Sequence, residues 1–141
     1  MFENILIALD GSKNSYDALN EALILAKKFN TKLYVVSVVN IANLPTNVGV
    51  SYEPNLEREL SQDAQIILNN SQRIIESHKI DYEMDLLSGE PRDELIDFAN
   101  RKQIGLVILG KSGVHALERF FVGSVTRYIS EHFNGNVLIV S

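Results

Sequence analysis

Hydrophobic and polar positions along the chain alternate between two patterns. Short, mainly apolar runs are typical of β-strands, and runs without a charge fit strands buried on both faces. Such runs lie at residues 2–9, 33–39, 82–87, 106–109 and 136–140. The longer segments between them carry apolar residues at helical spacing, most clearly at residues 19, 22, 23 and 26. The chain is therefore predicted to alternate strands and helices.

Helices are predicted at residues 14–29, at residues 56–78, from Pro91 onward and at residues 124–133. Pro91 suits a first helical position, because the N–H that proline lacks has no partner there in any case. Strands that alternate with helices are joined by parallel crossovers, which indicates a doubly wound α/β fold in a single domain, residues 1–141. In such folds ligands bind beyond the carboxyl ends of the strands, where the strand order reverses.

The segment Asn40–Asn55 interrupts the alternation. It contains Pro45, Gly49 and Pro54 and shows little periodicity. Loops of this length are uncommon in compact domains unless they are functional or mobile. Two interpretations stay open: a flexible flap beside a binding site, or a connection without a role of its own.

Candidate chemistry lies in the stretch Ile104–Thr126. Its strand ends at Gly110, and Gly113 follows in the next turn. A predicted helix begins at Gly123 and Ser124. Glycines let backbone N–H groups approach a ligand closely, and a helix start adds free N–H groups with partial positive charge. These features suggest a cradle for a phosphate chain; the alternative is a strand, a turn and a capped helix without a ligand.

The spacing of these residues resembles a signature of the universal stress protein family. Gly110, two residues, Gly113, nine residues and then Gly123-Ser124 match the pattern G-x2-G-x9-G-(S/T), which in that family marks the members that bind ATP. Residues 5–12, 89–99 and 137–140 resemble the family's first strand and turn, its third helix and its closing strand. The resemblance to an ATP-binding member thus covers nearly the whole chain.

The resemblance implies a Rossmann-like, five-stranded parallel sheet in the order 3-2-1-4-5 with helices on both faces. Strands one and four are then neighbours, which brings Asp10 and Gly110 to the same crevice. The resemblance also implies that the closing strand, Val137–Val140, pairs with the same strand of a second copy. We therefore expect a homodimer, which agrees with the need of an apolar edge strand to be covered or paired.

The candidate nucleotide-binding residues are Leu9, Asp10, Val38, Gly110, Lys111, Gly113, Gly123, Ser124, Val125 and Thr126. The family positions of Asp10 and Val38 contact the ribose or the adenine, and Leu9 packs nearby. From the residues alone, Asp10 could instead cap the following helix. The resemblance places the two glycines of the first turn against ribose and phosphate, and residues 123–126 around the phosphates.

Three cations near this motif are candidates for compensating phosphate charge. Lys111 replaces the small serine or threonine that the family often has at this position, and its charge would either hold a phosphate or face solvent. Arg119 and Arg127 are further candidates, and surface ion pairing is the alternative for each of them.

Composition narrows the function classes. The formal net charge of −5 argues against nucleic acids and anionic membranes as partners. The absence of cysteine excludes thiol catalysis and thiolate metal sites. The first apolar run is too short for a signal peptide or a membrane span, so we expect a cytoplasmic location.

The resemblance to the family implies an adenine-nucleotide-binding stress-response protein, with ATP as the ligand and magnesium carried only by the triphosphate. It would act as a ligand-dependent regulatory or interaction switch. We designate no catalytic residue, because no paired acid and base and no nucleophile with its base emerge from the sequence. The alternatives are a slow ATP hydrolase similar to the adenine-nucleotide α-hydrolases and an interaction module with an empty pocket.

Overall fold

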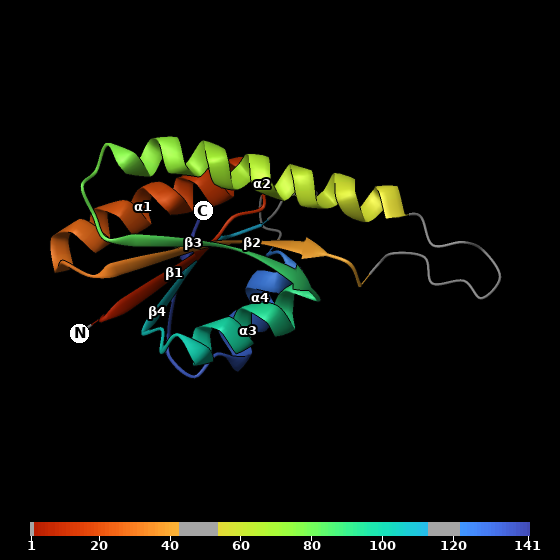
Figure 1. The fold of residues 1–141 in the computed structure, drawn as a ribbon. Coiled ribbons are helices and arrows are strands. Elements are labelled where there is room, and N and C mark those ends of the chain that lie inside the picture. The colour runs from red at the N-terminus through yellow and green to blue at the C-terminus, as the bar shows by residue number, and fades with distance from the viewer. Residues whose placement is uncertain (1, 43–53, 113–121) are drawn as a thin grey trace.

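Five parallel strands form one sheet with helices on both faces (Figure 1). The structure is a computed structural model that describes residues 2–42, 54–112 and 122–141. The strands are β1 (Asn4–Ala8), β2 (Lys32–Asn40), β3 (Tyr82–Gly89), β4 (Leu106–Gly110) and β5 (Asn136–Val140). The helices are α1 (Lys13–Phe29), α2 (Pro54–Glu76), α3 (Pro91–Arg101) and α4 (Ser124–His132). The strand order β3-β2-β1-β4-β5 confirms the predicted doubly wound sheet.

Side chains of the central strand β1 enter two separate cores. Ile5 and Ile7 pack with residues of α1 and α2, whereas Leu6 packs with residues of α3 and α4. All three side chains are fully buried, because successive residues of a strand point to opposite faces and both faces are covered. A strand in this position has to be apolar throughout, which explains the uncharged runs at residues 5–9 and 106–109.

The strand order reverses at β1, which lies between β2 and β4. Ile7 of β1 pairs with Val35 of β2 on one side and with Ile108 of β4 on the other. Since the strands are parallel, the turn after β1 and the segment after β4 leave the sheet at the same edge. This is the crevice that the sequence predicts for the ligand.

The first turn is held by its own side chains. Gly11 has a φ of 85°, a left-handed conformation that glycine adopts without strain. The backbone N–H of Ser12 donates to Oδ1 of Asp10 at 2.9 Å. The hydroxyl of Ser12 in turn accepts from the N–H of Ser15 at 3.1 Å and caps α1. The N-cap of α1 is therefore Ser12 and not Asp10, for which this role was the alternative.

Helix α2 is long and extends past the sheet. It runs over 23 residues, and its N-terminal part reaches beyond the carboxyl ends of the strands (Figure 1). Ala64, Leu68 and Ile75 are its buried apolar residues. Neither α2 nor any other helix in residues 2–42, 54–112 and 122–141 combines the length and hydrophobicity that a membrane span needs.

The elements differ from their predicted bounds by at most two residues at their ends, and β1 is shorter than the predicted run at residues 2–9. β2 reaches Asn40 and β3 reaches Gly89, because the two strands pair up to these last residues. α2 begins at Pro54, inside the predicted loop, at a first-turn position where proline is tolerated. The rest of that loop, residues 43–53, lies outside the described residues, and the flap hypothesis lies there with it.

Candidate functional site

A hollow of about 560 Å³ lies at the carboxyl ends of β1, β2 and β4. The last residues of these strands form its floor, and the first turns of α1, α3 and α4 border it. Four residues of α2, Leu60, Asp63, Ala64 and Ile67, form a further wall. A concave, mainly apolar site with a few polar groups is the usual form of a small-molecule site.

Most of the predicted residues line this one hollow. They are Leu9, Asp10, Val38, Gly110, Gly123, Ser124, Val125 and Thr126. Lys111 is described but does not line the hollow. Gly113 lies outside the described residues, as does Arg119. Segments that are far apart in the chain thus meet at the predicted crevice.

The end of β1 is fastened to β2 by backbone and side-chain hydrogen bonds. The N–H of Leu9 donates to the carbonyl of Val36 at 2.9 Å. The buried hydroxyl of Ser37 donates to the carbonyl of Leu9 at 2.9 Å. Both backbone groups of Leu9 are therefore used within the protein, and what this residue presents to the hollow is its apolar side chain.

Asp10 directs an exposed carboxylate toward the hollow. One of its oxygens, Oδ1, accepts the hydrogen bond from Ser12. The other, Oδ2, makes no hydrogen bond to a residue of the described part of the chain. An ionised carboxylate only accepts hydrogen bonds, so Oδ2 is suited to ligand hydroxyl or amino groups and repels phosphate.

Gly110 is required by the packing of α1 on β4. A Cβ atom placed on it would lie 2.8 Å from the carbonyl carbon of Asn14 and 2.9 Å from its oxygen. Those atoms belong to backbone and cannot move aside easily. The absence of a side chain at this position therefore has a structural reason that does not depend on a ligand.

The start of α4 is joined to the end of β4. The N–H of Gly123 donates to the carbonyl of Lys111 at 2.9 Å. The hydroxyl of Thr126 donates to the carbonyl of Gly110 at 2.8 Å, and Thr126 is buried. Its hydroxyl hydrogen thus fixes α4 against the sheet, and of the two hydroxyl groups in this turn only that of Ser124 is exposed.

The first N–H groups of α4 face the hollow without an acceptor in the helix. The first intrahelical bond runs from the N–H of Arg127 to the carbonyl of Gly123 at 2.9 Å. The N–H groups of residues 124–126 precede it, and no side chain caps them within the described residues. Unpaired N–H groups at a helix start carry partial positive charge and attract anions.

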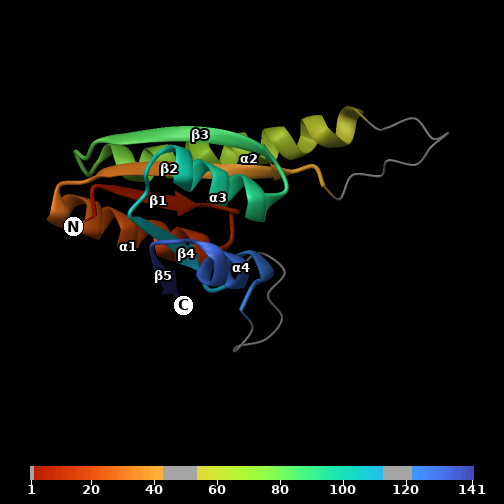
Figure 2. The same ribbon diagram turned by 90° about the horizontal axis from the view of Figure 1, so that it is seen from below.

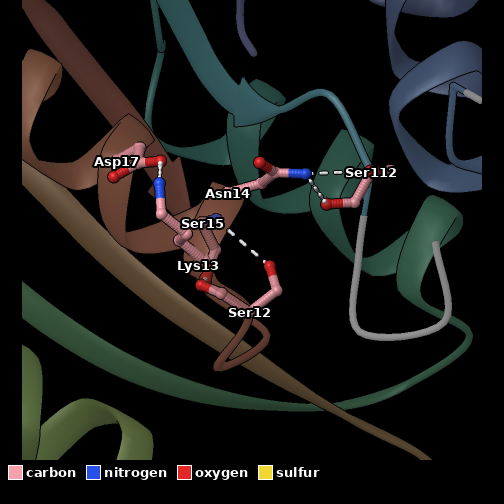
Figure 3. Close-up of polar contacts among 6 residues, drawn as sticks. All are labelled: Ser12, Lys13, Asn14, Ser15, Asp17 and Ser112. Atoms are coloured by element: carbon pink, nitrogen blue, oxygen red, sulfur yellow. Dashed lines mark hydrogen bonds and ion pairs between the residues drawn. The ribbon is translucent and has the colours of Figure 1, made fainter. Parts of the chain in front are cut away.

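Asn14 and Ser112 connect the two turns that border the hollow (Figure 3). The side-chain amide of Asn14 donates to the carbonyl oxygen of Ser112 at 3.2 Å and to its hydroxyl oxygen at 2.9 Å. Ser112 is buried and lines the hollow. The sequence carried no signal for this pair, because the contact spans 98 positions.

The wall formed by α2 was also missed. Leu60, Ala64 and Ile67 belong to an apolar stripe that predicts core packing, and periodicity does not distinguish a core from a pocket wall. Asp63 is an exposed polar residue of α2 between Leu60 and Ile67, which lie on the same side of the helix. Its place in the hollow follows only from the extension of α2 past the sheet.

These features define an α/β protein with a candidate ligand site at the switch point of a doubly wound sheet. Residues 1–141 match the model of the Universal stress protein family, and the chain belongs to this family. It is 30% identical to universal stress protein YxiE of Bacillus subtilis over 99% of each chain. It is 29% identical to universal stress protein MJ0531 of Methanocaldococcus jannaschii over 99% of this chain and 82% of that protein.

Solved structures of other universal stress proteins share the fold. UspA of Lactobacillus plantarum has a TM-score of 0.78 at 24% identity, with 98% of this chain and 97% of that chain covered. A universal stress protein in complex with cAMP has a TM-score of 0.74 at 21% identity over 99% and 97%. The protein from Archaeoglobus fulgidus in complex with dAMP has a TM-score of 0.70 at 23% identity over 98% and 97%.

Proposed function

We propose that the chain binds an adenine nucleotide, ATP with magnesium, in the hollow at the carboxyl ends of β1, β2 and β4. Bound nucleotide would act as the signal of a regulatory or interaction switch in the stress response. The observation that carries the proposal is the meeting of the predicted residues from three strand ends and the start of α4 around one hollow.

The donor set at the start of α4 suits a phosphate chain. The N–H groups of residues 124–126 are free of helix acceptors, and the exposed hydroxyl of Ser124 adds a further donor. Such groups bind phosphate through directed hydrogen bonds and the helix dipole. Magnesium would enter on the triphosphate, whose oxygens are its preferred ligands.

The opposite end of the hollow suits the nucleoside. Apolar side chains of Leu9, Val38 and Ile67 line it and offer a surface for a flat base. The carboxylate of Asp10 offers acceptors for ribose hydroxyls. Members of the family with the same fold have been solved with cAMP and with dAMP, which supports an adenine nucleotide as the ligand class.

The proposal includes a homodimer through β5. Leu138 and Ile139 are 37% and 39% exposed, and β5 is an edge strand that pairs only with β4 among the described strands. Apolar edge strands are usually covered by another element or chain. A second copy that pairs there would bury both side chains. We place the protein in the cytoplasm, where ATP is available to it.

Isothermal titration calorimetry with ATP, with and without magnesium, tests the proposal on the wild type and on Gly123→Val. Gly123 has φ −60° and ψ 151°, which valine adopts readily, so the variant is expected to fold. Its side chain would occupy the space beside the N–H groups of α4. The affinity for ATP should fall by about tenfold or more, comparable to the loss of one or two charge-assisted hydrogen bonds.

Gly105→Ala is the control, because a Cβ there would have only ordinary contacts, the nearest 3.7 Å from Phe2. Gly110 is unsuitable for this test, since its substitution would disturb the packing of α1. A folded wild type that binds no adenine nucleotide would overturn the proposal in favour of the interaction module. Phosphate release in the same samples would distinguish a slow hydrolase from a switch.

A further inference from the structure

A second, smaller hollow of about 300 Å³ adjoins the nucleotide site at the start of α4. Its lining comes mainly from α3 and α4, two helices that contact each other and are labelled in Figure 2. Its lining is Arg92, Val122, Ser124, Arg127, Tyr128 and Glu131. We call it the arginine groove. Ser124 lines both hollows, so the groove continues the site past the helix start.

The two hollows differ in charge. Among the residues that the structure describes, the charged ones that line the larger hollow are Asp10 and Asp63, and this part of the lining includes no lysine or arginine. The groove contains two guanidinium groups and the carboxylate of Glu131. A ligand with a neutral end and a polyanionic end is therefore oriented: the nucleoside belongs near Asp10, and the far phosphates belong near Ser124 and the groove.

The guanidinium of Arg92 is held in position. Its Nε donates to Oε1 of Glu90 at 2.9 Å, and it lies over the ring of Tyr128, with Cζ 5.3 Å from the ring centre. The side chain is still 45% exposed. The bond to Glu90 uses Nε, so it leaves the donors of the two terminal nitrogens to other acceptors. Held in this way, the planar group is pre-organised for an oxyanion.

Arg127 supplies a positive charge that is less neutralised by nearby carboxylates than that of Arg92, which pairs with Glu90. It is exposed on the first turns of α4 and forms no ion pair with a residue in 2–42, 54–112 or 122–141. It immediately follows the turn whose N–H groups face the larger hollow. A cation at the start of a helix is unfavourable for the helix itself, because the dipole there is also positive. An anion bound between them would relieve this repulsion.

We propose that the arginine groove is a subsite for the terminal phosphates of the bound nucleotide. Arg127 and Arg92 would then determine the preference for nucleotides with three phosphates over those with one. This inference rests on the nucleotide site proposed above. Ser124 lines both hollows, whereas the two arginines line only the groove. They therefore contact the β- and γ-phosphates of ATP and leave the single phosphate of AMP to the N–H groups of α4.

The test measures dissociation constants for AMP, ADP and ATP by calorimetry, without magnesium and at constant ionic strength. The variants are Arg127→Gln, Arg92→Gln and the double variant, since glutamine keeps side-chain length and helix propensity. Arg73→Gln is the matched control, because Arg73 is exposed on α2 and lines neither hollow. Circular dichroism verifies that each variant is folded.

We expect the wild type to prefer ATP over AMP. Arg127→Gln should lower this preference by about three- to tenfold, the range of a partly exposed charge-assisted contact, and the double variant should lower it further. AMP affinity should stay within about twofold, and Arg73→Gln should leave the preference unchanged.

Other outcomes separate the two proposals. If AMP and ATP both bind and the double variant keeps the ATP preference, the groove is not the phosphate subsite, while the nucleotide site stands. Equal weakening of AMP and ATP also overturns the subsite, since the arginines would then act on the whole site. If the folded wild type binds none of the three nucleotides, both proposals fail.

Discussion

The side-chain nitrogen of Asn14 lies 3.2 Å from the carbonyl oxygen of Ser112 and 2.9 Å from its hydroxyl oxygen. This pair joins the first turn of α1 to the segment after β4 (Figure 3). The two segments border the hollow from opposite sides of the switch point. The fold therefore holds the mouth of the site with a side-chain contact in addition to the strand pairing.

Asn14→Ala should lower the free energy of unfolding by about 1–3 kcal/mol, because it removes two donated hydrogen bonds and leaves the buried Ser112 hydroxyl without this partner. Urea denaturation followed by circular dichroism measures the change. Asn20→Ala is the matched control, since Asn20 is an exposed residue of the same helix. Equal stability of the two variants would show that the Asn14 pair contributes nothing beyond helix propensity.

The architecture of the chain could be predicted from its sequence because it depends on local patterns. The uncharged runs around Leu6 and Ile108 mark strands buried on both faces. Their alternation with helical spacing indicates parallel crossovers. The strand order needed the family resemblance, since hydrophobic patterns do not determine which strands are neighbours.

The candidate site could be predicted from the sequence where its residues belong to the glycine motif. Gly110 and Gly123 stand out by their spacing, but each also has a structural role. Gly110 leaves room for the backbone of Asn14, and the N–H of Gly123 donates to the carbonyl of Lys111. Spacing does not distinguish these tasks from ligand contact. The sequence analysis named Arg127 as a candidate for phosphate charge, but its place beside Arg92 in one groove could not be predicted, because the two belong to different helices that meet only in the fold.

Asp10 offers a test that separates its charge from its role in the turn. Asp10→Asn keeps an oxygen that accepts from the N–H of Ser12, whereas Asp10→Ala loses it. If the carboxylate accepts hydrogen bonds from ribose hydroxyls, Asp10→Asn should lower the affinity for ATP by about three- to tenfold. This is the difference expected between a charged and a neutral hydrogen bond.

Stability and affinity distinguish the two roles of Asp10. Asp10→Ala should also lower the unfolding free energy by about 1 kcal/mol, because the turn before α1 loses its acceptor. Calorimetry and urea denaturation of both variants provide the comparison. An asparagine variant with unchanged or higher ATP affinity would show that the carboxylate serves the turn alone.

Asp85 predicts a pH dependence of stability. Burial and then the negative charge of Glu83 raise the pKa of the Asp85 carboxyl above its usual value of 3.8, against the opposing effect of Lys102. Lys102 Nζ lies 3.5 Å from Oε2 of Glu83. Because the folded-state pKa is the higher one, the contribution of Asp85 is fully present below pH 3.8 and is lost as the pH rises through the folded-state pKa.

Asp85→Asn should therefore stabilise the protein at neutral pH and lose this advantage at acidic pH. The gain should be below about 1 kcal/mol, since Asp85 is only half-buried, although its Oδ2 is buried, and solvent screens its charge. Urea denaturation at a series of pH values measures it. Asp81→Asn, which removes one charge at an exposed position of the same region, is the control for the change in net charge. A stability difference that is flat with pH would contradict the raised pKa.

The closing strand predicts the oligomeric state. Leu138→Asp should shift the protein from dimer to monomer, because it places a charge on an apolar edge that a second copy would have to desolvate. Light scattering coupled to size-exclusion chromatography measures the mass. Concentrations of roughly tens of micromolar are suited to a dimer of ordinary affinity. Ile24→Asp is the control, since Ile24 is 58% exposed on α1 and does not belong to the edge strand, so it should leave the dimer intact. A monomeric wild type would contradict pairing through β5 and would leave Leu138 and Ile139 as exposed residues of an unpaired edge.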